Sequence, residues 1–246
     1  GQGGEEAGPW AWERTRARPR RGEAGPTATP LRADKAGIAK AEAKTHSRLF
    51  LLDNDGTLVR LRKKPRMAVP DSELVGLLGS VAAVPGNDLA IVTGRGHDEI
   101  EEWLGRIPGL TLVAEHGLFV KKPGGRWELT MEVASDWKKG IYEVLELYRD
   151  RMPGSVIEDK DYSLAFHYRQ VDPAIVKHSL GELKMTLLHL TAAVDLTLQE
   201  GKKVLEVKDS RFSKGTAAGI LLRARKLDIV LSAGDDGTDE DMFGTS

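Results

Sequence analysis

Cysteine is absent from the 246-residue sequence. A disulfide scaffold, a thiol nucleophile and a cysteine-ligated zinc ribbon are therefore excluded. Long apolar runs are also missing: the longest, such as 49–52 and 229–231, have the length of a strand, far short of the ~20 apolar residues that cross a membrane. The first residues lack the apolar core of a signal peptide. We expect no membrane partner and a cytoplasmic protein.

Neither sign of charge is in excess. The sequence has 36 Lys and Arg residues against 37 Asp and Glu residues, a formal net charge of −1. No global field therefore attracts nucleic acid or an acidic membrane surface. We expect no nucleic-acid partner, and any bound anion must be held by local groups.

Residues 1–45 are poor in the branched and aromatic residues that build a core. Gly, Pro, Ala, Arg and Glu dominate this segment, which predicts a disordered linker or tail. We interpret its basic cluster as a solvated charge run rather than a phosphate site. That cluster comprises Arg14, Arg16, Arg18, Arg20 and Arg21.

Strand and helix patterns alternate in residues 46–130. Continuous apolar runs at 49–52, 88–92 and 110–114 predict strands buried on both faces. Between these strands, apolar residues recur at helical spacing after Pro70 and again around Trp103, which predicts two helices. Such βαβαβ alternation predicts a doubly wound α/β core, in which a parallel sheet carries helices on both faces.

Residues 131–205 depart from this rhythm. A helix followed by two strands occurs twice, the second time from Asp172, an N-cap residue followed by proline. Sequential antiparallel strands do not belong to a doubly wound sheet, so we predict an inserted α+β subdomain of order αββαββ. The parallel pattern resumes in residues 206–246, and we expect this second part of the core to be truncated at its C-terminus.

Four polar clusters stand where an open α/β sheet places its ligands, at the carboxyl ends of parallel strands. Three directly follow predicted buried strands, and one opens a helix. They are Asp53-Asn54-Asp55-Gly56-Thr57, Thr93-Gly94-Arg95, Lys214-Gly215-Thr216 and Gly234-Asp235-Asp236-Gly237-Thr238-Asp239. Each cluster alone has an ordinary interpretation, such as a calcium loop or a turn. Their order and placement together favour a catalytic site.

Together, these residue types suit phosphoryl transfer. Carboxylates at Asp53 and Asp235 can share one hard cation such as Mg²⁺. Asp53 can attack phosphorus and form an aspartyl-phosphate, while Asp55 can protonate the leaving oxygen and then deprotonate water. Thr93, the backbone near Gly94, and Lys214 can neutralise the equatorial phosphate oxygens.

Over about residues 48–243 these clusters resemble the four motifs of the haloacid dehalogenase (HAD) superfamily of phosphatases. The resemblance implies a HAD-like core, Asp53 as nucleophile and Asp55 as acid and base. It also implies phosphate binding by Thr93, Gly94 and Lys214. Its implied Mg²⁺ site comprises Asp53, the main-chain carbonyl of Asp55, Asp235, and Asp239 in support. Asn54 departs from the aromatic residue usual between the two aspartates.

Motifs in and beside the inserted subdomain point to one family within this superfamily. Glu115-His116-Gly117, the ExKxYSxxxHYR pattern of 158–169 and the GxKxxEV pattern of 201–207 are similar to the trehalose-phosphate phosphatase family. This implies that the insert is a cap over the site. Without the resemblance, a solvated sheet face would be the preferred interpretation. The implied substrate-binding residues are Arg95, Glu115, His116, Glu158, Lys160, Ser163, His167, Arg169, Lys203 and Glu206.

The function expected from this resemblance is Mg²⁺-dependent hydrolysis of trehalose 6-phosphate to trehalose and phosphate. One alternative is a phosphatase for another sugar phosphate, such as sucrose phosphate or mannosylglycerate phosphate. Another is a non-catalytic sugar-phosphate sensor or synthase partner, although an inactive relative would be expected to lose Asp53 or Asp55. The linker-like start fits a longer protein that also contains a trehalose-phosphate synthase domain.

Overall fold

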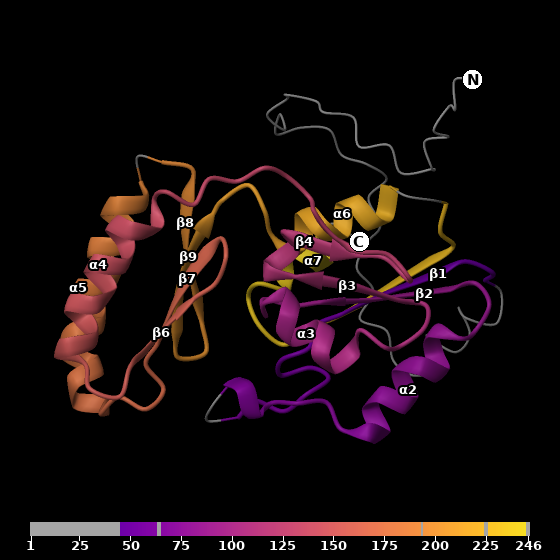
Figure 1. The fold of residues 1–246 in the computed structure, drawn as a ribbon, viewed down its shortest axis with the longest axis horizontal. Coiled ribbons are helices and arrows are strands. Elements are labelled where there is room, and N and C mark those ends of the chain that lie inside the picture. Colours follow the sequence, from indigo (N-terminus) through magenta and orange to yellow (C-terminus); the bar gives the residue numbers. More distant parts are fainter. Residues whose placement is uncertain (1–44, 63–64, 193, 224–225, 245–246) are drawn as a thin grey trace, which may run out of the picture.

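The computed structural model describes residues 45–62, 65–192, 194–223 and 226–244. These residues form two units side by side, one built on a mixed sheet and a smaller one on an antiparallel sheet (Figure 1). The predicted tail, apart from Thr45, and its arginine cluster lie outside the described residues. Within the described part of the chain, no helix is both long and apolar enough to cross a membrane.

The larger unit contains a six-stranded sheet in the order β10-β1-β2-β3-β4-β5. Its first four strands pair in parallel, and β4 and β5 add an antiparallel hairpin. This confirms the predicted parallel sheet. The strands are β1 (Arg48–Leu52), β2 (Asn87–Val92), β3 (Leu110–Ala114), β4 (Phe119–Lys121), β5 (Trp127–Leu129) and β10 (Ile229–Ala233).

Helices cover both faces of this sheet (Figure 1). Leu78 and Ile100, from two helices on one face, share a buried cluster with Ile91 of β2. Ala217 and Met242, from helices on the other face, pack in a second cluster with strand residues. The helices are α2 (Ser72–Ala82) and α3 (His97–Leu104) on the first face, and α6 (Lys214–Arg223) and α7 (Glu240–Phe243) on the second. Two short 3₁₀ helices are η1 (Pro65–Met67) and η2 (Glu115–Gly117).

The smaller unit has the predicted αββαββ order. Its antiparallel sheet runs β6-β7-β9-β8, with both helices on one face (Figure 1). The elements are α4 (Lys138–Arg151), β6 (Val156–Asp159), β7 (Ser163–His167), α5 (Pro173–Thr191), β8 (Leu196–Gly201) and β9 (Val204–Asp209). β9 pairs with β8 as far as Asp209, so this strand continues past residue 205, where the sequence placed the boundary.

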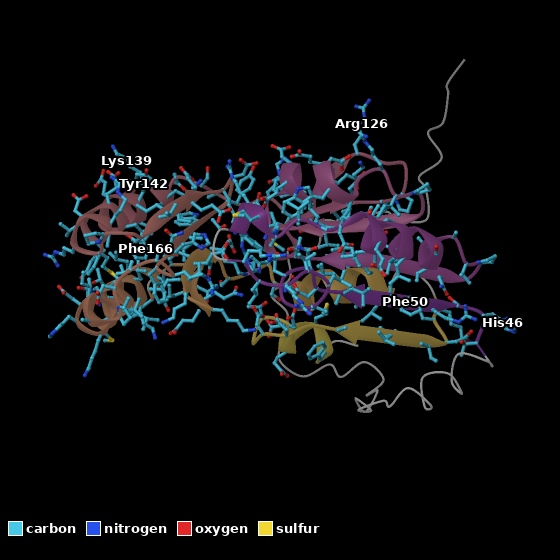
Figure 2. The ribbon with its side chains drawn as sticks, turned by 90° about the horizontal axis from the view of Figure 1, so that it is seen from below. His46, Phe50, Arg126, Lys139, Tyr142 and Phe166 are labelled. Carbon is cyan, nitrogen blue, oxygen red and sulfur yellow. The ribbon has the colours of Figure 1, made fainter. Side chains whose placement is uncertain are left out.

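Side chains alternate along the strands of the smaller unit. Phe166 and Leu205 point into the apolar cluster beneath α4 and α5, and Phe166 lies between sheet and helices in Figure 2. Their neighbours Ala165 and Glu206 belong to the opposite face because successive residues of a strand alternate. Glu206 of that face and Lys160 of the adjoining β6–β7 turn contact the loops at the carboxyl ends of β3 and β2. The fold thus places a polar sheet face against the loops that carry the motifs.

Candidate active site

Asp53 lies directly after β1 and is only 3% exposed. Its N–H donates to the carbonyl of Ala233 in β10 at 2.9 Å, which fixes the start of the loop. Its Oδ1 accepts a hydrogen bond from Lys214 at 2.6 Å, whereas its buried Oδ2 has no partner among the described residues. Burial raises the pKa of Asp53 to about 6, against the opposing effect of Lys214. A buried carboxylate with one free oxygen is a candidate for binding a cation or attacking a substrate.

Lys214, the first residue of α6, carries the positive charge of the site. Its ammonium is buried and donates to Asp53 at 2.6 Å and to Asp239 at 2.7 Å. Burial works to lower the pKa of Lys214, but the two carboxylates outweigh burial and raise it. Lys214 is therefore charged and stands beside the candidate nucleophile, where it can attract an anion.

Asp239 organises the loop after β10. Its Oδ2 accepts the N–H groups of Asp235 at 2.9 Å and Asp236 at 3.1 Å, while its Oδ1 accepts from Lys214. The Asp235 carboxylate lies against Gly56, where any side chain would collide with it. Gly56 also has a φ of 98°, which favours glycine. Two loops far apart in sequence thus bring Asp235 next to the motif of Asp53.

Asp53, Asp235 and Asp239 each offer a carboxylate oxygen, and these atoms lie within 4.8 Å of one another, so the group could hold a metal ion. Carboxylate oxygens suit a hard cation. Both oxygens of Asp239 already accept hydrogen bonds, which leaves Asp53 and Asp235 as the more available ligands. The unpartnered Oδ2 of Asp53 is the observation that fits a bound cation.

Asp55 is held by a buried arginine. Arg95 donates to its two oxygens at 2.7 and 2.5 Å and also donates to Glu99 at 2.9 Å. The guanidinium further stacks over the ring of Trp103, 4.7 Å from the ring centroid. The resemblance implied that Arg95 binds substrate, and in the structure its guanidinium contacts Asp55 and the α3 residues Glu99 and Trp103. A buried guanidinium requires such anionic partners.

The second motif turns sharply after β2. The carbonyl of Thr93 accepts the N–H of His116 at 2.9 Å, and the Thr93 hydroxyl accepts the N–H of Arg95 at 3.2 Å. A side chain at Gly94 would begin 2.5 Å from the His116 ring. The carbonyl of Gly94 accepts a hydrogen bond from Lys160 of the smaller unit at 2.9 Å. The absence of a side chain at Gly94 leaves room for the His116 ring of the same unit.

Glu206 is the centre of a buried polar cluster between the units. It accepts from Lys160 at 2.8 Å and Ser163 at 2.7 Å, and its other oxygen lies 2.8 Å from Nε2 of His116. Burial works to raise the pKa of Glu206, but Lys160 and His116 outweigh burial and hold that pKa well below the usual range. The cluster is therefore anionic at Glu206 and cationic at Lys160, a set suited to hydroxyl groups.

The remaining implied substrate residues divide into two groups. Glu115 is 2% exposed and its Oε2 has no partner among the described residues, while Glu158 pairs with His167 at 2.7 Å. Burial works to raise the pKa of Glu115 and of Glu158, and both carboxyl groups lie near enough to the Glu206 cluster for the charge of Lys160 to oppose that effect. Arg169 instead donates to the carbonyl of Lys202, and Lys203 lies over the ring of Tyr168. No described contact joins Arg169 or Lys203 to the cluster.

Two residues that the sequence motifs do not specify also contact residues of the site. Lys202 donates to Asp235 at 2.5 Å, and Nδ1 of His97 lies 3.7 Å from Glu115. Lys202 is adjacent in sequence to the motif residue Lys203, and this is the one feature of the sequence that could have indicated a role for Lys202. His97 opens α3 and carried no local signal, because its position depends on the packing of that helix.

Buried polar atoms without a hydrogen-bond partner gather around these loops. Among the described residues they include Oδ1 of Asn54, Oγ1 of Thr57 and Nδ1 of His116, besides those of Asp53 and Glu115. Buried polar groups in native proteins are nearly always paired. Such a concentration indicates that a polar ligand completes this site.

Comparison with known proteins agrees with this geometry. The sequence model of the trehalose-phosphatase family matches residues 51–245. A bifunctional trehalose-6-phosphate synthase/phosphatase of Thermoproteus tenax is 44% identical over 201 residues, which are 82% of this chain and 27% of that protein. The chain thus spans about a quarter of the length of that relative.

Solved structures are similar as well. The C-terminal domain of C. albicans trehalose-6-phosphate phosphatase matches with a TM-score of 0.78 and 31% identity, over 84% of this chain and 76% of that one. A haloacid dehalogenase-like hydrolase from B. subtilis, 16% identical, shares the fold with a TM-score of 0.56 over 80% of this chain and 86% of its own. The HAD-like core expected from the motifs is confirmed, and the chain belongs to the trehalose-phosphatase family.

Proposed function

We propose that this chain hydrolyses trehalose 6-phosphate to trehalose and inorganic phosphate. The observation that carries the proposal is the position of Asp53. Its unpartnered oxygen lies in a buried site that also holds Lys214, and Lys160 and Glu206 of the smaller unit line the polar cluster nearby. Phosphate chemistry and hydroxyl recognition are both supported within one site. The relatives named as trehalose-6-phosphate phosphatases support the same reaction.

In the first half of the proposed reaction, an oxygen of Asp53 attacks phosphorus and the bond from phosphorus to the sugar oxygen breaks. Asp55 gives its proton to the leaving sugar oxygen, so trehalose departs neutral. Asp55 must first exchange Arg95, which engages both of its oxygens, for the substrate oxygen. Arg95 keeps an anionic partner during this exchange because it also binds Glu99.

In the second half, Asp55 removes a proton from water, and the water oxygen attacks the phosphorus of the aspartyl-phosphate. The bond from phosphorus to Asp53 breaks, which releases phosphate and restores the carboxylate. We propose that Lys214, the Thr93 hydroxyl and the Gly94 amide neutralise the phosphate oxygens in both halves. The attacking, proton-moving and charge-neutralising groups thus all come from the larger unit.

We infer that the metal of the acidic group is Mg²⁺, held by Asp53 and Asp235 with the main-chain carbonyl of Asp55. Asp239 would support these ligands because it already binds the backbone around Asp235. When bound, Mg²⁺ offsets the repulsion between a carboxylate nucleophile and a phosphate dianion. The hard oxygen donors, without a nearby cysteine, favour Mg²⁺ over softer metals.

The smaller unit supplies the sugar specificity in this proposal and acts as a cap. Glu206 and Lys160 offer acceptors and donors in fixed positions, and Glu115 has a free oxygen beside them. Sugar hydroxyls can satisfy both kinds of group. We further propose that the chain functions in the cytoplasm. We also propose that it acts beside a trehalose-phosphate synthase domain, because the name of the Thermoproteus tenax relative combines a synthase with a phosphatase.

Phosphate release from a panel of sugar phosphates tests the proposed function. Trehalose 6-phosphate, sucrose 6-phosphate, glucose 6-phosphate and mannosylglycerate phosphate would be compared by kcat/KM in the presence of Mg²⁺. We expect trehalose 6-phosphate to exceed each of the others by about tenfold or more, since mismatched hydroxyls leave buried polar groups unpaired. A preference for another sugar would overturn the substrate while leaving the phosphatase chemistry.

Substitution of Lys160 by Met is expected to separate sugar recognition from phosphate chemistry. The ammonium contacts Glu206 and the carbonyl of Gly94, so its loss leaves a buried carboxylate without its cation. We expect kcat/KM for trehalose 6-phosphate to fall about tenfold or more, and hydrolysis of p-nitrophenyl phosphate to change less than about threefold. Lys177 is exposed on α5, and Lys177→Met is the control that should leave both activities unchanged. Equal losses on both substrates would place Lys160 in fold stability instead.

A further inference from the structure

Lys138 begins α4 at a position that helix chemistry disfavours. The positive end of the helix dipole lies at the N-terminus, where acidic side chains are preferred. The first turn of α4 contains no acidic residue, and its N-cap residue, Trp137, makes no capping hydrogen bond with its side chain. Lys138 and Lys139 stand there instead. Such a departure from a local rule is expected where a residue serves the tertiary structure.

The ammonium of Lys138 binds the turn between β6 and β7. It donates to the main-chain carbonyl of Lys160 and, at 3.3 Å, to that of Asp161, and it forms an ion pair with Asp159. The side chain is 17% exposed. These acceptors match the three N–H donors of an ammonium group. One side chain on α4 therefore holds a turn that lies about twenty residues further along the chain.

That turn contacts the Thr93-Gly94-Arg95 turn of the larger unit. Lys160 reaches from it to the carbonyl of Gly94 at 2.9 Å and to Glu206 at 2.8 Å. Two residues later, the ring of Tyr162 packs beside Phe119 of the larger unit, with ring centroids 5.9 Å apart. A shift of the turn would move Lys160 away from both of its partners. The position of Lys160 thus depends on groups that do not themselves reach the site.

We propose that Lys138 is a positioning residue, which fixes the β6–β7 turn so that Lys160 meets Gly94 and Glu206. Lys138 acts through the main chain of the turn and does not touch the substrate. The catalytic consequence rests on the proposed function, because Lys160 matters for turnover only if it lines the sugar site. The structural part, a turn held by Lys138, stands independently of which substrate is hydrolysed.

Kinetics of Lys138→Met, which keeps the aliphatic stem and removes the ammonium, test the catalytic part. We expect KM for trehalose 6-phosphate to rise about fivefold or more, with kcat within about twofold, because sugar binding is weakened and the phosphate chemistry is not. Lys138→Arg should recover at least half of the lost kcat/KM. The matched control is Lys139→Met, whose side chain projects outward from the adjacent position of α4 (Figure 2) and should behave as wild type.

A double-mutant cycle decides whether Lys138 acts through Lys160. In the Lys160→Met background, Lys138→Met is expected to change kcat/KM by less than about twofold, since the residue that it positions is already gone. Additive losses would overturn the proposal, as would equal losses on trehalose 6-phosphate and p-nitrophenyl phosphate. Either result would assign Lys138 a general role in stability.

Amide hydrogen exchange separates this inference from the proposed function. The N–H of Lys160 donates to the carbonyl of Ser163 at 3.1 Å and closes the turn. We expect this amide to exchange at least about tenfold faster in Lys138→Met, with α5 amides unchanged. Unchanged exchange at Lys160 in this variant would overturn the positioning role, and Lys138→Gln, which also removes the charge, provides the same comparison if the Met variant fails to fold. Absence of trehalose 6-phosphate hydrolysis by the wild type would overturn only the proposed function.

Discussion

Asp53→Asn is expected to lower turnover of a sugar phosphate by at least about a thousandfold. An amide oxygen is a far weaker nucleophile than a carboxylate, and the substitution also removes a candidate metal ligand. The fold should survive because asparagine has nearly the same shape, and Lys214 keeps Asp239 as an anionic partner. Burial already disfavours the charge of Asp53, so its loss does not remove a strongly stabilising group. Single-turnover phosphate release and thermal unfolding would measure the two effects separately.

Asp98→Asn is the matched control for this substitution. Asp98 has the same side chain on the surface of the larger unit, where it is 99% exposed, and we expect its variant to retain wild-type turnover. A well-folded Asp53→Asn enzyme that kept more than about a hundredth of the wild-type rate would argue against covalent catalysis by Asp53. Trapping of a phosphorylated protein in the wild type and not in the variant would support it.

Removal of divalent metal is expected to reduce activity at least about a hundredfold, and added Mg²⁺ should restore it. The Asp53 and Asp235 carboxylates face the same space, and without a cation they repel a phosphate dianion. Phosphate release before and after EDTA treatment, followed by titration with Mg²⁺, measures this dependence. Undiminished activity in metal-free buffer would exclude the proposed cofactor.

Two substitutions around Asp235 refine this prediction. Asp235→Asn should raise the Kd for Mg²⁺ because it removes a charged ligand. Lys202→Met should lower that Kd, since the ammonium of Lys202 now binds an Asp235 oxygen and competes with a metal for it. Isothermal titration with Mg²⁺ would measure both changes without reference to turnover. An unchanged Kd in Asp235→Asn would mean that Asp235 is not a ligand.

The sequence alone determined the architecture of both units. The apolar run of β1, the alternation that follows it and the twofold αββ order of the insert predicted a parallel core and an antiparallel unit, which the structure contains. The motif positions also followed from the sequence, since Asp53 comes directly after β1 and Asp235 comes two residues after the end of β10. Periodicity and strand ends are properties of neighbouring residues, and neighbouring residues are what a sequence displays.

Only the tertiary structure decided the partners of the charged side chains. The motif suggested a substrate-binding role for Arg95, and the structure adds that its guanidinium binds Asp55, 40 positions earlier in the chain. Likewise, Lys160 meets Gly94 across 66 positions. Lys138, which begins a helix, is tied to the turn that carries Lys160 and had no recognisable signal. A buried charge pairs with whichever opposite charge or carbonyl the packing brings within about 3 Å, and that proximity depends on how separate segments are placed in space.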